Sequence, residues 1–244
     1  MRAARQQVTL TLEDGRNLPL KIRRSHRARR ILLHIGIYDG LLEIVLPPGA
    51  PVQDGVRFAR TQARWVSDQL SLIGNAIPFV DGACFPLLDR TVRIRGVEDR
   101  NALPVLEGDD LWVSGNKEAL NGRVRRWLIA RALTEIKPRA HTMATKIHRT
   151  PAQIRMRDTK SRWGSCSRNG NLNFSWRLVL APEAVLDYVV AHEVAHLREL
   201  NHSEAFWAVV QDLCSESAQS RKWLRVNGAT LHRYGRSITP LESL

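Results

Sequence analysis

Cysteine is scarce in this chain of 244 residues, and long apolar runs are missing. The three cysteines, Cys84, Cys166 and Cys214, lie far apart, which argues against a disulfide framework and against a CxxC zinc cluster. No run approaches the roughly 18 apolar residues of a membrane-spanning helix. The basic N-terminus lacks the apolar segment of a secretory signal. We therefore expect a cytoplasmic protein without a membrane partner.

Acidic residues are fewer than basic ones: 24 aspartates and glutamates stand against 37 lysines and arginines, so the net charge is +13. Arginine carries most of the excess, with the densest cluster at residues 21–30 and a second at Arg123, Arg125, Arg126 and Arg131. Such clusters attract nucleic acid, anionic membranes or acidic partners, but they also occur on ordinary solvated surfaces. No pattern of aromatic residues for base stacking accompanies the first cluster. Charge alone therefore leaves nucleic-acid binding open.

Residues 1–110 have the pattern of a β-rich region with one amphipathic helix. Turn signals at 13–15 and 38–40 predict two β-hairpins, with strands at 8–12, 18–22, 31–37 and 41–46. Further short strands are expected at 91–95 and 111–113. Between them, apolar residues at alternating steps of three and four predict a single helix through Val56, Ala59, Ala63, Val66, Leu70 and Ile73.

Residues 115–244 have a more helical pattern. Apolar spacing predicts a helix from about 117 to 137, where Pro138 interrupts it. Alternation over 153–157 predicts a half-buried strand. An Asn-Gly turn at 168–171 predicts a β-hairpin with one apolar side, and Pro182 opens a helix that extends to about Glu199.

This last helix contains the sequence AHEVAHLRELNH, which begins at Ala191. His192 and His196 are four residues apart, so a helix stacks them about 40° apart and lets both imidazoles face one metal ion. Glu193 is rotated by about 100° and need not be a ligand. It is instead placed to take a proton from a zinc-bound water.

A catalytic zinc usually has three protein ligands and one open position. His202 is the candidate for the third ligand. Asn201 interrupts the helix before it, and Ser203 resembles the N-cap of a following helix at 204–213. His202 therefore lies at a turn that can bring it back towards the metal.

The chain resembles the YgjP-like metallopeptidases, relatives of the SprT-like proteases within the zincin group. The resemblance covers roughly residues 20–235, and these strings carry it: RSHRARRILLHI, IPFVDG, RDTKSRWGSCS, GNLNFSWRLVLAP, LDYVVAHEVAHLRELNHSEAFW and WLRVNGATLHRYG. It implies an α+β fold, with a zincin-like catalytic region at 115–244 after the β-rich region at 1–110. It also implies His192, His196 and His202 as metal ligands and Glu193 as the catalytic residue. Glu199 stands where metzincins have glycine, which argues against that subgroup.

Other residues near these motifs have structural interpretations. Trp163 and Trp176 are expected to pack the hairpin against the active-site helix, while the backbone of the hairpin's edge strand could pair with a peptide. Cys166 is expected to be a small buried residue and not a nucleophile. Phe206 and Trp207 are expected to anchor the helix after His202. Nothing in the sequence ties His232 or Tyr234 to the metal.

Three functions remain in view. The first is a zinc metallopeptidase that hydrolyses protein or peptide substrates with a water activated by Glu193. The second is a nucleic-acid-associated protein with a structural zinc site. The third is a metal-dependent hydrolase of another amide or ester. Glu193 beside the ligands favours catalysis, because a closed structural site has no use for a free carboxylate.

Overall fold

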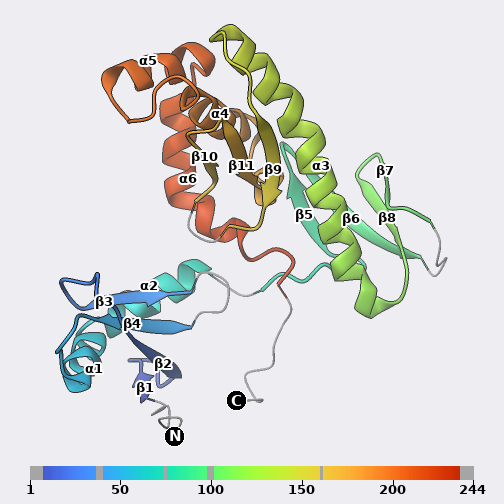
Figure 1. Ribbon diagram of the computed structural model, residues 1–244. Helices are drawn as coiled ribbons and strands as arrows, with labels where there is room; N and C mark the ends of the chain where they lie inside the picture. Colours follow the sequence, from blue (N-terminus) through green and yellow to red (C-terminus); the bar gives the residue numbers. More distant parts are fainter. Residues whose placement is uncertain (1–7, 37–40, 74–75, 98–101, 160–161, 237–244) are drawn as a thin grey trace, which may run out of the picture. The chain divides into compact units, whose positions relative to one another are not determined.

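The computed structural model describes residues 8–36, 41–73, 76–97, 102–159 and 162–236 (Figure 1). Within them the fold is mixed α+β, with six α-helices and three small sheets. The chain divides into two compact units, Met1–Asn75 and Ala76–Leu244. The division expected from sequence fell between residues 110 and 115. The difference arises because the four strands after Ala76 share a core with the following helices.

The first unit contains a four-stranded sheet in the order β1-β2-β4-β3. Its elements are β1 (Val8–Thr11), β2 (Asn17–Arg24), β3 (Leu32–Ile35), β4 (Leu42–Leu46), α1 (Val52–Thr61) and α2 (Ala63–Ile73). β1 pairs with β2 and β3 with β4 in antiparallel fashion, which confirms both hairpin pairings. The predicted turn at 38–40 lies outside the described residues. The parallel pairing of β2 with β4 joins the hairpins.

The single helix predicted through Val56 and Ile73 is wrong, because the chain forms two helices with a turn at Gln62. The Thr61 hydroxyl donates a hydrogen bond to the Phe58 carbonyl, 2.8 Å away. A continuous helix would pair that carbonyl with the N–H of Gln62. The Gln62 N–H instead bonds the Ala59 carbonyl at 3.0 Å, which tightens the last turn and ends α1.

The second unit contains two sheets, in the orders β5-β6-β8-β7 and β10-β11-β9. Its strands are β5 (Cys84–Leu87), β6 (Arg90–Val97), β7 (Val105–Glu107), β8 (Asp110–Ser114), β9 (Gln153–Arg157), β10 (Gly164–Cys166) and β11 (Asn171–Ser175). Its helices are α3 (Lys117–Lys146), η1 (Trp176–Leu180), α4 (Glu183–Ala195), α5 (Glu204–Leu213) and α6 (Ser217–Leu231). The strands predicted at 91–95, 111–113 and 153–157 and the hairpin around 168–171 are confirmed.

The long helix α3 packs against strands of both sheets and against α4 (Figure 1). Its buried residues recur at steps of four: Leu120, Val124, Leu128, Ala132, Ile136, Ala140 and Ala144. Each such step turns the stripe by about 40°, so the buried stripe winds around the helix and contacts different neighbours along its length. Near its start, Leu120 lies by Gly96 of β6, and further along Arg139 pairs with Asp187 of α4.

The expected end of this helix before Pro138 is wrong, since α3 continues to Lys146. Pro138 is exposed, whereas Ile136 and Ala140 are buried. The proline ring and the backbone groups that it leaves unpaired therefore face solvent, which lowers the cost of an internal proline. The buried stripe on the opposite side continues without a break and holds the helix together.

The start and the end of the second unit are joined by backbone pairing. The Ile77 N–H donates to the Arg233 carbonyl at 2.9 Å, and the Gly235 N–H donates to the Ile77 carbonyl at 2.9 Å. Gly235 has a φ of +74°, and a β-carbon there would lie 2.6 Å from the Phe79 ring. The segments around Ile77 and Gly235, which are far apart in the sequence, therefore lie side by side.

No helix among the described residues combines the length and the apolar character needed to cross a membrane.

Candidate metal centre

Helix α4 carries the first candidate ligand and the candidate base. Its buried residues include Val190, Val194 and Ala195, and it packs against α3, β10, α5 and α6. The helix ends at Ala195, one turn before the predicted end near Glu199, and His196 is its C-cap residue. The C-terminal end of α4 therefore places a second candidate ligand, His196, in the site.

The ring of His196 is oriented by the turn that follows α4. Its Nδ1 lies 2.9 Å from the backbone carbonyl oxygen of Glu199. A carbonyl oxygen only accepts hydrogen bonds, so Nδ1 carries the proton and Nε2 has its lone pair free for a metal. Such a carbonyl contact is the usual support for a metal-binding histidine.

His202 returns to the site from the loop between α4 and α5. The Ser203 N–H donates to Asn201 Oδ1 at 3.2 Å, and Ser203 Oγ accepts from the Phe206 N–H at 3.4 Å. This cap starts α5 immediately after His202, as predicted. The reversal of the chain brings the His202 ring against the rings from α4.

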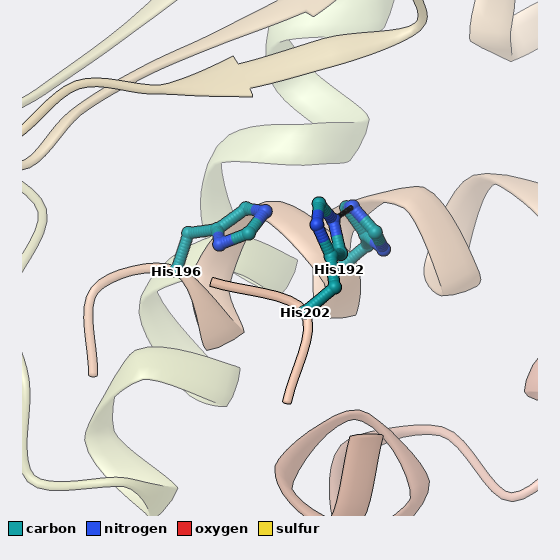
Figure 2. A group of neighbouring side chains, drawn as sticks. All are labelled: His192, His196 and His202. Carbon is teal, nitrogen blue, oxygen red and sulfur yellow. Dashed lines mark hydrogen bonds between the residues drawn. The ribbon is translucent and has the colours of Figure 1, made fainter. Parts of the chain in front are cut away.

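The three histidines converge (Figure 2). One ring nitrogen from each of His192, His196 and His202 lies within 4.8 Å of the other two. Nε2 of His192 and Nε2 of His202 are 3.2 Å apart. In Figure 2 the ring of His196 points towards the rings of His192 and His202, which lie next to each other. The structure thus brings together all three residues that the sequence analysis selected as ligands.

Phe206 forms an aromatic support beneath the cluster. Its ring centroid lies 4.9 Å from that of His192, 4.5 Å from that of His196 and 4.7 Å from that of His202. The Phe206 side chain is fully buried, so it gives the three imidazoles a fixed surface to pack against. The sequence analysis expected a core anchor at Phe206 but not its contact with every candidate ligand.

Burial keeps two of the imidazoles neutral at neutral pH. It lowers the pKa of His192 to about 4, and the neighbouring His196 and His202 act in the same direction. Burial also lowers the pKa of His196. A neutral imidazole is the form that binds a metal. Three imidazole ligands suit zinc, at roughly 2.0–2.1 Å each, and a tetrahedral site of that size places its nitrogens about 3.3 Å apart. The separation of His192 and His202 agrees with that spacing, so the residues fit a metal ion.

Glu193 is buried beside this cluster but is not one of the converging groups. Burial raises the pKa of its carboxyl to about 7, against the opposing effect of the nearby Arg162 cation. The carboxylate lies against Gly164 of β10, where a β-carbon would be 2.6 Å from Oε1. Only a residue without a side chain leaves room for this carboxylate.

A cavity of about 250 Å³ opens beside His192 and Glu193. Trp163 and Gly164 line it from the hairpin, and Tyr188 lines it from α4. The sequence analysis missed Gly164 and Tyr188. Signals for both existed, since a glycine inside a strand often marks a close approach and Tyr188 lies one helical turn before His192.

The remaining candidates from the sequence take positions around this cavity. Trp163 stacks on His232 with a centroid distance of 5.1 Å and packs against Gly228 of α6. Trp176 is buried at the start of η1, directly after the hairpin strand β11. Burial, with the Glu193 charge, raises the pKa of the Cys166 thiol to about 11, so the thiol stays protonated. Protonation makes it a poor nucleophile.

The model of the family described as "YgjP-like, metallopeptidase domain" matches residues 29–227. The chain belongs to the YgjP-like family. This membership confirms the resemblance inferred from the motifs. It makes the protein a metal-dependent peptidase, and so a hydrolase, at the level of the family. Comparisons with curated proteins and with solved structures returned no match.

Proposed function

We propose that the protein is a zinc-dependent peptidase in which His192, His196 and His202 hold the metal and Glu193 is the general base. The observation that carries this proposal is the convergence of three imidazoles next to a cavity that Glu193 also lines. Because Glu193 is outside the converging set, its oxygens stay available for proton transfer. A closed structural site would not need such a residue.

The chemistry divides between the metal and the chain. Bound zinc lowers the pKa of a water ligand towards about 7 and polarises a carbonyl group. Glu193 accepts a proton from the attacking water on a carboxylate oxygen and later delivers it to the leaving amine. A base with a pKa near the working pH performs both transfers well, and burial raises the pKa of Glu193 to about 7. Phe206 and the Glu199 carbonyl keep the ligand rings in place.

The hairpin next to Glu193 supports a peptide as the substrate. β10 is the outer strand of its sheet. The Trp163 carbonyl accepts a hydrogen bond from the Ser175 N–H of β11 at 2.8 Å, and the Ser167 N–H donates to the Asn171 carbonyl of β11 at 3.0 Å. Alternation along an antiparallel strand then turns the backbone groups of Gly164 and Cys166 to the open edge. An extended peptide paired there would pass Glu193, which lies against Gly164.

The test compares the wild-type protein, Glu193→Gln and Glu199→Gln, each loaded with zinc, on a proteome-derived peptide library. Zinc content is measured in all three. We expect Glu193→Gln to retain zinc and to lose turnover, because the amide cannot accept the proton. Glu199→Gln is the matched control, since the bond to His196 uses the backbone of Glu199 and survives the change. Cleavage by Glu193→Gln at the wild-type rate would show that the base is misassigned.

We propose nucleic-acid association as a second function, carried by the arginine segment 24–30 of the first unit. Arg24, Arg27, Arg29 and Arg30 are exposed, and none forms an ion pair with a described residue. Elsewhere in this unit, Arg16 and Arg57 are paired with nearby aspartates. Four exposed guanidinium groups within seven residues concentrate positive charge, which attracts the phosphates of a nucleic acid.

Fluorescence anisotropy with labelled double-stranded DNA and RNA tests this second function. We expect binding that weakens steeply with salt, and loss of binding in the triple variant Arg27→Ser, Arg29→Ser, Arg30→Ser. The control is the double variant Arg16→Ser, Arg57→Ser, which removes paired arginines. Equal affinity in the triple variant and the wild type, or no binding at low salt, would refute the assignment.

A further inference from the structure

The cavity next to the candidate metal centre is lined by apolar side chains, by the Glu193 carboxyl group and by one cation. Trp163, Val189 and Leu224 supply apolar surface from the hairpin, from α4 and from α6. Arg162 lines the same cavity and is exposed. The volume of about 250 Å³ is close to the lower end of the usual range for ligand sites, roughly 300–1,000 Å³. This is room for one or two residues of a substrate and not for a large cofactor.

Arg162 differs from Arg139 and Arg177, two arginines near α4 that are paired with carboxylates. Arg139 pairs with Glu135 and Asp187, and Arg177 pairs with Asp158. Arg162 forms no salt bridge with a carboxylate in the described part of the chain, although its charge lowers the pKa of Glu193, which lines the same cavity. Its positive charge is therefore available to a ligand that enters the cavity.

The backbone at Arg162 is held in place. The Thr159 hydroxyl donates to the Arg162 carbonyl at 2.6 Å. The next residue, Trp163, is fixed between His232 and Gly228, where a β-carbon would lie 3.1 Å from the indole. Gly164 then contacts Glu193. The backbone that carries the Arg162 side chain is thus held in place, two residues before Gly164, which contacts Glu193.

We propose that this cavity is a substrate subsite that accepts an apolar side chain against Trp163, Val189 and Leu224 and a carboxylate at Arg162. The assignment rests on the proposed peptidase function and names its substrate class: peptides with an anionic group next to a large apolar residue, close to the scissile bond. A guanidinium binds a carboxylate through two parallel hydrogen bonds, which an amide cannot reproduce with equal strength. The carboxylate comes either from an acidic side chain or from the free C-terminus of the peptide.

Matched peptides test the subsite in the zinc-loaded full-length protein. The set is built around a sequence cleaved in the library, or around a Leu-containing peptide if none is cleaved. It carries Glu, Gln or Lys next to Leu, and each peptide is made with a C-terminal acid and with a C-terminal amide. Cleavage rates are measured with the wild type, Arg162→Glu and Arg168→Glu. Arg168 is an exposed arginine in the turn of the same hairpin and does not line the cavity, so it controls for net charge.

We expect the wild type and Arg168→Glu to prefer Glu over Lys by about tenfold or more, and Arg162→Glu to reverse this order. A preference for the C-terminal acid over the amide would identify the C-terminus as the source of the carboxylate. If Arg162→Glu kept the wild-type order, the subsite assignment would be wrong.

Binding of the same peptides to Glu193→Gln, followed by fluorescence anisotropy, separates the two proposals. If the protein binds the Glu peptide more tightly than the Lys peptide and Arg162→Glu reverses this preference, the subsite is supported. This holds even if no variant cleaves any peptide, and the lack of cleavage would then refute only the peptidase function. Turnover without any preference for a carboxylate would support the peptidase and refute the subsite.

Discussion

Gly164 and Glu193 are in direct contact across the site. A β-carbon on Gly164 would lie 2.4 Å from Cγ and 2.6 Å from Oε1 of Glu193, closer than any packed side chain tolerates. Gly164 belongs to the edge strand β10, whereas Glu193 is on α4. The missing side chain therefore sets how closely α4 approaches the strand, and with it the position of the carboxylate.

Gly164→Ala should displace the Glu193 carboxylate without disturbing the histidines. We expect kcat to fall by about 100-fold, since a shift of about 1 Å in a catalytic group has effects of that size. Zinc affinity should stay unchanged, because the atoms that a β-carbon at Gly164 would meet first all belong to Glu193 and not to the histidines. Ser165→Ala on the same strand is the control for general damage to the hairpin. An unchanged kcat in Gly164→Ala would contradict the role of Glu193 as the base, because the reaction would not depend on the position of its carboxylate.

His202→Ala should weaken metal binding more than any change outside the cluster. The variant leaves two imidazoles, and we expect zinc affinity, measured by competition with a chromogenic chelator, to fall by at least about 100-fold. Chelation should lower the melting temperature of the wild type but not that of the variant, because a ligand bound only to the folded state stabilises it. His141→Ala on the exposed face of α3 is the control. Equal zinc affinity in the two variants would remove His202 from the ligand set.

His232 should make the metal-free protein sensitive to acid. Burial lowers its pKa to about 4, whereas an unfolded chain titrates near its ordinary value of 6.5. The unfolded state therefore binds the proton first as the pH falls. The stability linked to the neutral ring is complete above pH 6.5 and is lost between pH 6.5 and pH 4.

Urea unfolding of the wild type and His232→Phe at pH 7.5, 5.5 and 4.5 measures this loss. Phenylalanine keeps an aromatic ring against Trp163 but does not titrate. We expect the free energy of unfolding to fall less steeply with acid in the variant. Some dependence should remain, because burial also lowers the pKa of His192 to about 4. Identical pH profiles would contradict the buried neutral histidine.

Cys166 should react slowly with alkylating reagents. Burial and the charge of Glu193 raise the pKa of its thiol to about 11, so at pH 8 only about 0.1% of it is the reactive thiolate. Cys84 is exposed and should be labelled first by iodoacetamide. Raising the pH towards 10 should speed the labelling of Cys166, as followed by peptide mapping. Labelling of Cys166 at pH 8 as fast as that of Cys84 would point to an activated thiol.

Local patterns in the sequence were sufficient for much of the second unit. The Asn-Gly turn predicted the β10–β11 hairpin, and Ser203 predicted the start of α5. These features depend on neighbouring residues, so the sequence contains the information needed to place them. Pro138 and Gln62 show the limit of this approach. Helix α3 continues past Pro138 because the proline is on the side that faces solvent. Helix α1 ends at Gln62 because the Phe58 carbonyl is already bonded to the Thr61 hydroxyl.

The sequence by itself determined which residues could form a metal centre, because the spacing of His192 and His196 on a helix and the turn before Ser203 are local properties. Only the tertiary structure decided the environment of those residues. Phe206 supports the three rings, Gly164 admits the Glu193 carboxylate, and Arg162 faces the cavity, each through contacts between segments distant in the chain or on different elements. Packing of this kind depends on the shapes of surfaces that meet only after folding, and no periodicity along the chain encodes it.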